Sequence, residues 1–376
     1  MPETAAHTSA EPFIDFTRSI PPMPAIFQAR LSRSLAKLAG EENIDLLART
    51  AISGGGMMDR EAGARWLAPR FGSSITADRI AVTNGTQSAV LLLLEALVGA
   101  DGLLLAESLS WGVIREVARR AHVRIKGLPI DDDGIIPETF EEACRNERPK
   151  ALYCNPTDQN PTTAIMPEGR RRAIVEIARR YGVTIIEDDA IGRLHPEAPL
   201  PIATIAPEIT WYVMGLTKCI AHGLRLAYIV GPSPAATERV MGPARRLSFW
   251  APTSLTAAIA SRWINDGTAD EICTAIREEN AKREELASSF LSDTDLVSKP
   301  GAMHVWLRLG TEHDRHGFAA TLKEQQVLVR PAELFAVDDV PLPNAVRLSL
   351  SSPLDRNDVE RGLRIIAANL KQPQGF

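Results

Sequence analysis

A lysine and an arginine lie close together in a loop after an apolar run, and both side chains could act on an anionic ligand. Residues 211–231 read WYVMGLTKCIAHGLRLAYIVG, with Lys218 in the loop and Arg225 seven residues further on. An ammonium group directly after a buried strand is costly to desolvate without a partner. Because a lysine amine can form an imine with a carbonyl compound, Lys218 is the first candidate for covalent chemistry.

Further candidates also stand directly after apolar runs. They are Gly85, Thr86 and Gln87 in TNGTQ, Trp111 after AESLS, Asn160 in NPTDQNP, and Asp188 and Asp189 in IIEDDA. Each has an ordinary explanation on its own, such as a strand-to-helix turn at Gly85 or a loop cap at either aspartate. Together they match one cofactor, pyridoxal phosphate, which needs a lysine for an imine, a carboxylate for the ring nitrogen, an anion cup with an arginine, and an aromatic face.

The order of the apolar and amphipathic segments predicts how these residues are brought together. From residue 79 to residue 231, short apolar runs alternate with amphipathic segments. The alternation predicts an α/β fold with a mostly parallel sheet that helices cover on both faces. Ligands of such sheets bind at the carboxyl ends of the strands, where the candidate residues stand.

The character of the chain changes after residue 240. Long helices are expected at 242–267 and 268–293, followed by the strands of a smaller α+β unit. The first 45 residues contain one helical pattern and are expected to join that unit. We therefore predict a large domain at 46–245 and a small domain made of residues 1–45 and 246–376.

The composition of the 376-residue chain narrows the classes of partner. The formal net charge of −5 disfavours nucleic acid. No apolar run approaches the roughly 20 residues that a membrane-spanning helix needs. The four cysteines lack the spacing of a metal site or a disulfide framework, so no metal is expected. Because the first residues lack the pattern of a secretory signal, the cytoplasm is the expected location.

Several motifs resemble those of the fold-type I pyridoxal-phosphate aminotransferases, and most of all the catalytic domain of MocR-type proteins and their stand-alone relatives. ALYCNPTDQNPTTAIMPEGRRRAIVEIARR is similar to the family's asparagine-proline loop and the helix after it. IIEDDAIGRL resembles its acidic strand end, and GLTKCIAHGLRLAYIVGP resembles its lysine loop. The resemblance spans residues 75–370 and implies a large, mostly parallel α/β domain with a smaller α+β domain.

The resemblance also implies a role for each candidate residue. Lys218 would bind the cofactor and move the proton at the substrate, and Asp189 would pair with the ring nitrogen, with Asp188 as the alternative. The other cofactor contacts would come from Gly85, Thr86, Thr217 and Arg225 around the phosphate, Gln87 beside them, Trp111 over the ring and Asn160 at the phenolic oxygen. Arg347 in NAVRLSL would bind the substrate carboxylate, because guanidinium geometry favours bidentate pairs.

The substrate site is expected to include further contributions. Asn160 would lie at the substrate as well as at the cofactor. Arg18 would be a candidate contact for an anionic substrate group, because the N-terminal segment covers the substrate in relatives. Family members complete each site with the partner subunit, so the resemblance implies a homodimer that takes a small amino acid as substrate.

Two tyrosines of the family are missing from this sequence. Ile191 stands where relatives carry a tyrosine at the phenolic oxygen, and Thr50 stands near the place of another that reaches the partner's phosphate. The loss of a hydrogen-bond donor to the phenolic oxygen is expected to raise the pKa of the imine between lysine and cofactor and to alter the fate of the substrate carbanion. We predict an aminotransferase acting on an amino acid and a 2-oxo acid. The alternative is elimination, replacement or carbon–carbon bond formation in specialised biosynthesis, for example on an S-adenosylmethionine-like amino acid.

Two other classes of protein are less consistent with the sequence. An effector-sensing domain of a MocR-type regulator is a second alternative, although the fold is expected to begin within the first 15 residues with no basic helix-turn-helix pattern before it. A dinucleotide-binding oxidoreductase is disfavoured, because no GxGxxG follows an apolar run.

Overall fold

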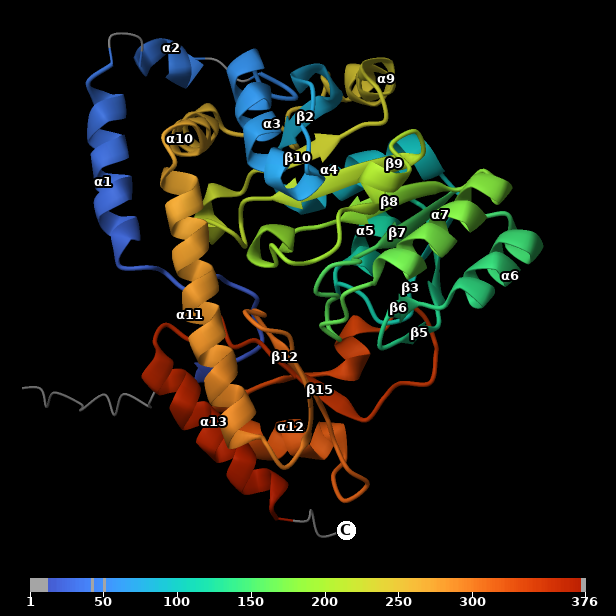
Figure 1. Ribbon diagram of the computed structural model, residues 1–376, viewed down its shortest axis with the longest axis vertical. Coiled ribbons are helices and arrows are strands. Elements are labelled where there is room, and N and C mark those ends of the chain that lie inside the picture. The colour runs from blue at the N-terminus through green and yellow to red at the C-terminus, as the bar shows by residue number, and fades with distance from the viewer. Residues whose placement is uncertain (1–12, 42–43, 50–51, 373–376) are drawn as a thin grey trace, which may run out of the picture.

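The computed structural model describes residues 13–41, 44–49 and 52–372, and its centre is a seven-stranded sheet (Figure 1). In spatial order the strands are β2 (Ile80–Thr83), β10 (Ala227–Val230), β9 (Thr210–Gly215), β8 (Thr184–Asp188), β7 (Ala151–Cys154), β3 (Leu103–Glu107) and β4 (Arg124–Leu128). Strand β10 runs antiparallel to both of its neighbours, and the other adjacent pairs are parallel. The predicted mostly parallel α/β fold is confirmed.

Helices cover both faces of this sheet. Successive strand residues point to opposite sides, and here the side chains on both sides are apolar. In β2, Ile80 and Val82 belong to one apolar core and Ala81 to the other. The first face is covered by α3 (Met57–Phe71), α6 (Pro137–Glu147), α7 (Glu168–Tyr181) and α10 (Ser254–Asn265). The second face is covered by α4 (Gly85–Leu93), α5 (Ile114–Arg120) and α9 (Pro234–Ala244). A near-continuous apolar run in each strand is the sequence signature of this burial on both faces.

A second, antiparallel sheet is built from the last third of the chain. Its order is β11 (Asp295–Val297), β12 (Val305–Arg308), β15 (Ala345–Leu348) and β14 (Arg330–Pro331). Helices α12 (Arg315–Glu324) and α13 (Arg356–Leu370) pack with it around one apolar core. The long helix α11 (Thr268–Phe290) runs from the central sheet down beside α13 (Figure 1).

The N-terminal segment joins both parts of the molecule. Strand β1 (Ile14–Asp15) pairs in parallel with β13 (Val327–Leu328), while α1 (Ile26–Ala39) contributes Leu38 to the core of the large sheet. Other short elements include α2 (Ile44–Arg49), α8 (Ile202–Ile205) and the hairpin of β5 (Ile130–Asp131) and β6 (Gly134–Ile135). The domain boundaries at 45/46 and 245/246 stay a prediction.

One expected helix is shorter than the sequence pattern indicates. The helix expected at 242–267 begins only at Ser254, after α9 has ended at Ala244. Pro252 disfavours the helical conformation of the residue before it, which explains the break. The helix expected at 268–293 is present as α11. None of the described helices is long and apolar enough to cross a membrane.

Candidate functional site

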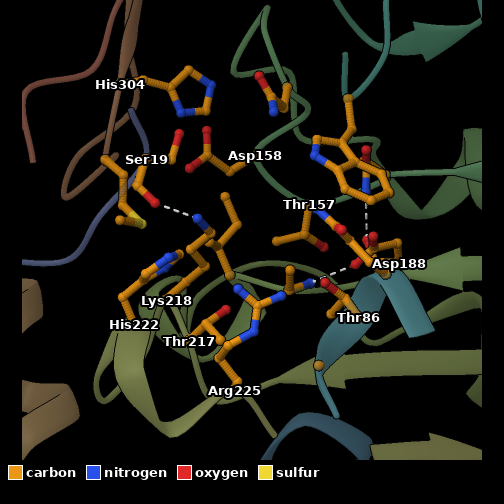
Figure 2. Close-up of a pocket in the computed structure, with 18 residues that line it drawn as sticks. Ser19, Thr86, Thr157, Asp158, Asp188, Thr217, Lys218, His222, Arg225 and His304 are labelled. Carbon is orange, nitrogen blue, oxygen red and sulfur yellow. Dashed lines mark hydrogen bonds between the residues drawn. The ribbon is translucent and has the colours of Figure 1, made fainter. Parts of the chain in front are cut away.

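A pocket opens at the carboxyl ends of the central strands, between the large sheet and the last third of the chain (Figure 2). The sequence-predicted residues that line it are Gly85, Thr86, Gln87, Trp111, Asn160, Asp188, Thr217, Lys218 and Arg225. They come from the ends of β2, β3, β7, β8 and β9 and from the loop after Lys218. The carboxyl ends of the parallel strands meet at one edge of the sheet, so Gly85 and Arg225, which are 140 positions apart, line the same cavity.

Lys218 lies in the middle of this cavity and has a lowered pKa. Its Nζ donates a hydrogen bond to the backbone carbonyl of Ser19, from the N-terminal segment. Burial, with the nearby charge of Arg347, lowers the pKa of Lys218 to about 8. A lysine with this pKa has a substantial neutral fraction near pH 8, and the neutral amine is the form that attacks carbonyl carbon.

The start of α4 forms an anion cup. Gly85 has a φ of +82°, a left-handed conformation that glycine adopts without strain. Within the part of the chain that the structure describes, the N-cap residue Asn84 makes no side-chain capping bond, which leaves amides of the first turn available to a ligand. Thr86 and Arg225 face the same space from two sides (Figure 2). This cup has the donors and the positive charge that a phosphate group requires.

The two adjacent aspartates lie in different environments. Asp188 lines the pocket and accepts hydrogen bonds from the Tyr153 hydroxyl (2.8 Å) and the Ala190 amide (3.1 Å). Burial raises the pKa of Asp188 to about 6, so the group is ionised at neutral pH.

Asp189 does not line the pocket. Its Oδ2 accepts from Arg70 Nε (2.9 Å) and from the Tyr212 hydroxyl (2.7 Å), and its side chain is fully buried. The sequence-based order put Asp189 ahead of Asp188, whereas the pocket geometry favours Asp188 for a contact with a bound ring. Adjacent residues at a strand end point to opposite sides, and only one of the pair can reach the cavity.

Arg347 lies directly behind the pocket wall. It is 2% exposed, and its guanidinium donates to Oδ1 of Asn160 (2.8 Å) and to the carbonyl of Thr17 (2.7 Å). Its Nε has no hydrogen-bond partner among the described residues. Burial, together with the charge of Arg330, lowers the pKa of Arg347 to about 9. Arg347, the predicted carboxylate-binding residue, thus contacts the pocket residue Asn160, and its Nε remains available as a hydrogen-bond donor.

Arg18 is not brought into the pocket. Its side chain is exposed, and the neighbouring Ser19 is the N-terminal residue that lines the cavity. Ile191 does line the pocket, so an apolar side chain occupies the wall where relatives were expected to have a tyrosine. Thr50 lies outside the described residues.

Sequence reasoning missed several polar residues of the wall. The pocket also contains Ser19, Asn155, Thr157, Asp158, His222 and His304. Asp158 and His304 could have been found from the sequence, because they lie in the stretches NPTDQNP and PGAMHVWLRL. Each is a titratable residue within a motif that is otherwise apolar or typical of a loop. Among the described residues, no cluster of His, Cys, Asp and Glu could hold a metal ion.

The known proteins to which this chain is similar include both aminotransferases and transcriptional regulators. The family model described as "Aminotransferase class I and II" matches residues 36–366. The chain is 27% identical over 333 residues to the uncharacterized HTH-type transcriptional regulator YdeF of Bacillus subtilis, covering 88% of this chain and 71% of that protein. It is 24% identical over 319 residues to the 2-aminoadipate transaminase of Thermus thermophilus, covering 82% of this chain and 78% of that protein.

This chain matches only part of the length of some regulators, whereas it matches nearly the whole of a solved aminotransferase structure. The chain spans 62% and 65% of the length of two further Bacillus subtilis regulators that it matches, YisV and YdfD. The crystal structure of LysN, the α-aminoadipate aminotransferase of Thermus thermophilus, superposes with a TM-score of 0.85 at 21% identity. That match covers 96% of this chain and 92% of LysN, and it shows a shared fold.

Proposed function

Because this chain belongs to the class I and II aminotransferases, a family that works with pyridoxal phosphate, we propose that it transfers the amino group of an amino acid to a 2-oxo acid. One observation carries the proposal. A lysine with a pKa of about 8 shares a cavity with an anion cup at a helix start and with a buried carboxylate. These three groups are the ones that the reactive carbonyl, the phosphate and the ring nitrogen of the cofactor require.

The residues of the pocket fit the cofactor, with one change from the sequence assignment. Gly85, Thr86, Gln87, Thr217 and Arg225 would hold the phosphate, Trp111 would cover the ring, and Asn160 would bond the phenolic oxygen. Asp188 takes the place proposed for Asp189 at the ring nitrogen. Asp189 instead accepts hydrogen bonds from Arg70 and Tyr212, which stabilises the end of β8. When bound, pyridoxal phosphate supplies an electron sink for the bond that breaks at the substrate's α-carbon.

The chain's own residues then divide the remaining work. Lys218 takes the proton from the α-carbon and returns it, which its lowered pKa permits near neutral pH. Asp188 stays ionised above pH 6 and so keeps a protonated ring nitrogen paired. Arg347 binds the α-carboxylate of the substrate, and its contacts with Asn160 and Thr17 hold the guanidinium in place for this task. Ser19 and Ile191 form one side of the cavity wall.

We also propose that the protein is a homodimer located in the cytoplasm and acting in biosynthesis. Large exposed apolar side chains at the start of α3 and in residues 247–255 support the dimer, namely Met57, Met58, Leu247, Phe249 and Leu255. The second of these segments is bonded to the anion cup, because Asn84 donates its amide to the carbonyl of Trp250. All four cysteines are free thiols, which suits a reducing compartment.

The test is the absorption spectrum of the purified, cofactor-loaded protein as single amino acids are added without any oxo acid. An aminotransferase converts the cofactor to its amine form and releases the oxo acid that matches the donor. Lys218→Ala is the control, since it removes the proton carrier. Release of ammonia or loss of the side chain, with the cofactor unchanged, would refute amino-group transfer and favour the elimination or replacement reaction.

A further inference from the structure

The pocket contains a polar region that none of the cofactor contacts uses. Asp158, from the loop after β7, and His304, just before β12, both line the cavity. Figure 2 shows the Asp158 carboxylate pointing toward the His304 ring, with Ser19 and Lys218 nearby. Asp158 has a φ of +53°, the left-handed region that aspartate tolerates better than most residues. Its carboxylate lies in the pocket wall and not at the outer surface, since the Asp158 side chain is buried.

Both side chains are buried and have unused hydrogen-bonding capacity. Asp158 is 1% exposed and His304 is 2% exposed. Oδ2 of Asp158 lies 3.0 Å from Nε2 of His195, whereas its Oδ1 has no partner among the described residues. Nε2 of His304 also has no partner there. Because a buried polar atom without a partner costs free energy, these two atoms mark a place where a ligand group belongs.

The carboxylate of Asp158 is the group in this region that favours a hydrogen-bond donor with positive charge. Burial lowers the pKa of His304 to about 4, so the ring is neutral at pH 7 and does not cancel the charge of Asp158. Burial also lowers the pKa of Arg347, and the charge of Asp158 partly offsets that effect, which places the two side chains in one electrostatic neighbourhood. Arg347 has its own ligand in the substrate's α-carboxylate. The free oxygen of Asp158 is therefore left for the substrate side chain.

We propose that Asp158 and His304 form the side-chain subsite and select amino acids whose side chain ends in a cationic N–H donor, such as a guanidinium or ammonium group. Acidic side chains are rejected by the charge of Asp158, and apolar side chains leave its buried oxygen without a partner. The inference rests on the proposed function in taking the ligand to be an amino acid.

The test uses three carboxylates of matched length that have no α-amino group and so cannot react: 5-guanidinopentanoate, heptanoate and heptanedioate. Calorimetry on the cofactor-loaded protein measures the three Kd values. The guanidino compound is expected to bind at least about tenfold more tightly than heptanoate, because hydrogen bonds to charged groups contribute that much, and heptanedioate is expected to bind most weakly. Equal affinities, or a preference for heptanoate or heptanedioate, would overturn the proposal.

Variants then assign the preference to the two residues. Asp158→Asn keeps the shape and removes the charge, and it should reduce the preference for the guanidino compound to about threefold or less. His304→Gln tests the second group and should reduce the preference in part. Asp293→Asn makes the same charge change at an exposed turn and should leave all three affinities unchanged. A preference that survives in Asp158→Asn would overturn the assignment to Asp158. If that variant fails to fold, the three affinities of the unmodified protein still test the proposed selectivity, and His304→Gln tests the place of the subsite.

The two proposals fail in different ways. If no amino acid converts the cofactor to its amine form, amino-group transfer is wrong, yet the unreactive carboxylates still measure the subsite. If conversion occurs with apolar or acidic donors and the carboxylates show no preference, the transfer stands and the subsite proposal is wrong.

Discussion

Burial and neighbouring charge set the properties of single side chains in this pocket. Lys218 and Arg347 both lose basicity on burial, and each lies close enough to another cation to lower its pKa further. Asp188 and Asp189 differ only in the side of the strand end to which they point, yet one faces the cavity and the other pairs with Arg70. Residue type alone therefore does not fix a role, and substitutions at neighbouring positions should have different consequences.

Substitution of the two aspartates separates catalysis from stability. Asp188→Asn should slow the half-reaction with an amino acid by about 100-fold or more, since the charge that stabilises the ring nitrogen is removed. Asp189→Asn leaves the buried Arg70 without its carboxylate and should lower the free energy of unfolding by about 3 kcal/mol or more. Stopped-flow spectroscopy and urea unfolding measure the two effects. The opposite pattern would restore Asp189 as the partner of the ring nitrogen.

The pKa of Lys218 predicts how the empty protein captures its cofactor. Covalent capture requires the neutral amine, so its rate should rise about fivefold from pH 7 to pH 8 and less than about twofold from pH 8 to pH 9. A lysine with an ordinary pKa would give about a tenfold rise per pH unit throughout this range. In Arg347→Gln, the loss of a nearby positive charge should raise the pKa of Lys218, so the capture rate should level off at a higher pH. Rapid mixing with cofactor, followed by borohydride trapping, gives the rates.

The strands and helices of the central sheet could be predicted from the sequence. Most of the predicted pocket residues lie at the ends of those strands. The alternation between 79 and 231 indicated the parallel sheet, and the polar residues after its strands do meet in one pocket. The pattern could not tell Asp188 from Asp189, because that choice depends on which way the chain turns as it leaves the strand. It also missed Asp158, since the direction of a side chain in an irregular loop leaves no periodic signal.

The start of α4 is the element whose geometry can be tested most directly. Gly85→Ala forces a side chain into a φ of +82°, which costs about 1–2 kcal/mol, and it should weaken binding of inorganic phosphate and of the cofactor. The nearest atom to an added Cβ is 3.9 Å away, so backbone strain rather than a clash is the cause. Gly182→Ala, at the C-terminus of α7 with a φ of +68°, is the matched control. It should lower stability to a similar extent while the affinity for phosphate stays the same.

At the scale of the whole molecule, the N-terminal segment ties the two sheets to the pocket. β1 pairs with β13, the Ser349 amide donates to the carbonyl of Phe16, and the next carbonyls along the chain reach Arg347 and Lys218. The sequence indicated that this segment joins the smaller unit but showed no strand partner for it. A two-residue strand gives too short a pattern to recognise, and its partner lies about 310 residues away.

Phe16 is the anchor of that segment, and its removal should loosen the pocket from a distance. Its ring is fully buried and packs against Gly362 of α13, where an added Cβ would lie 2.4 Å from it. Phe16→Ala should lower the free energy of unfolding by about 3–5 kcal/mol. Because the carbonyls of Thr17 and Ser19 lose their fixed positions, the KM for the amino donor should rise more than kcat falls.

Phe140→Ala provides the comparison for this effect, since Phe140 of α6 is an equally buried ring that belongs to a different apolar core from Phe16. It should lower stability by a similar amount while KM stays close to that of the unmodified protein. Steady-state kinetics below the unfolding temperature of both variants separate the two cases. A rise in KM of equal size in both would mean that the N-terminal segment has no special part in holding the substrate, and that general loss of stability explains the change.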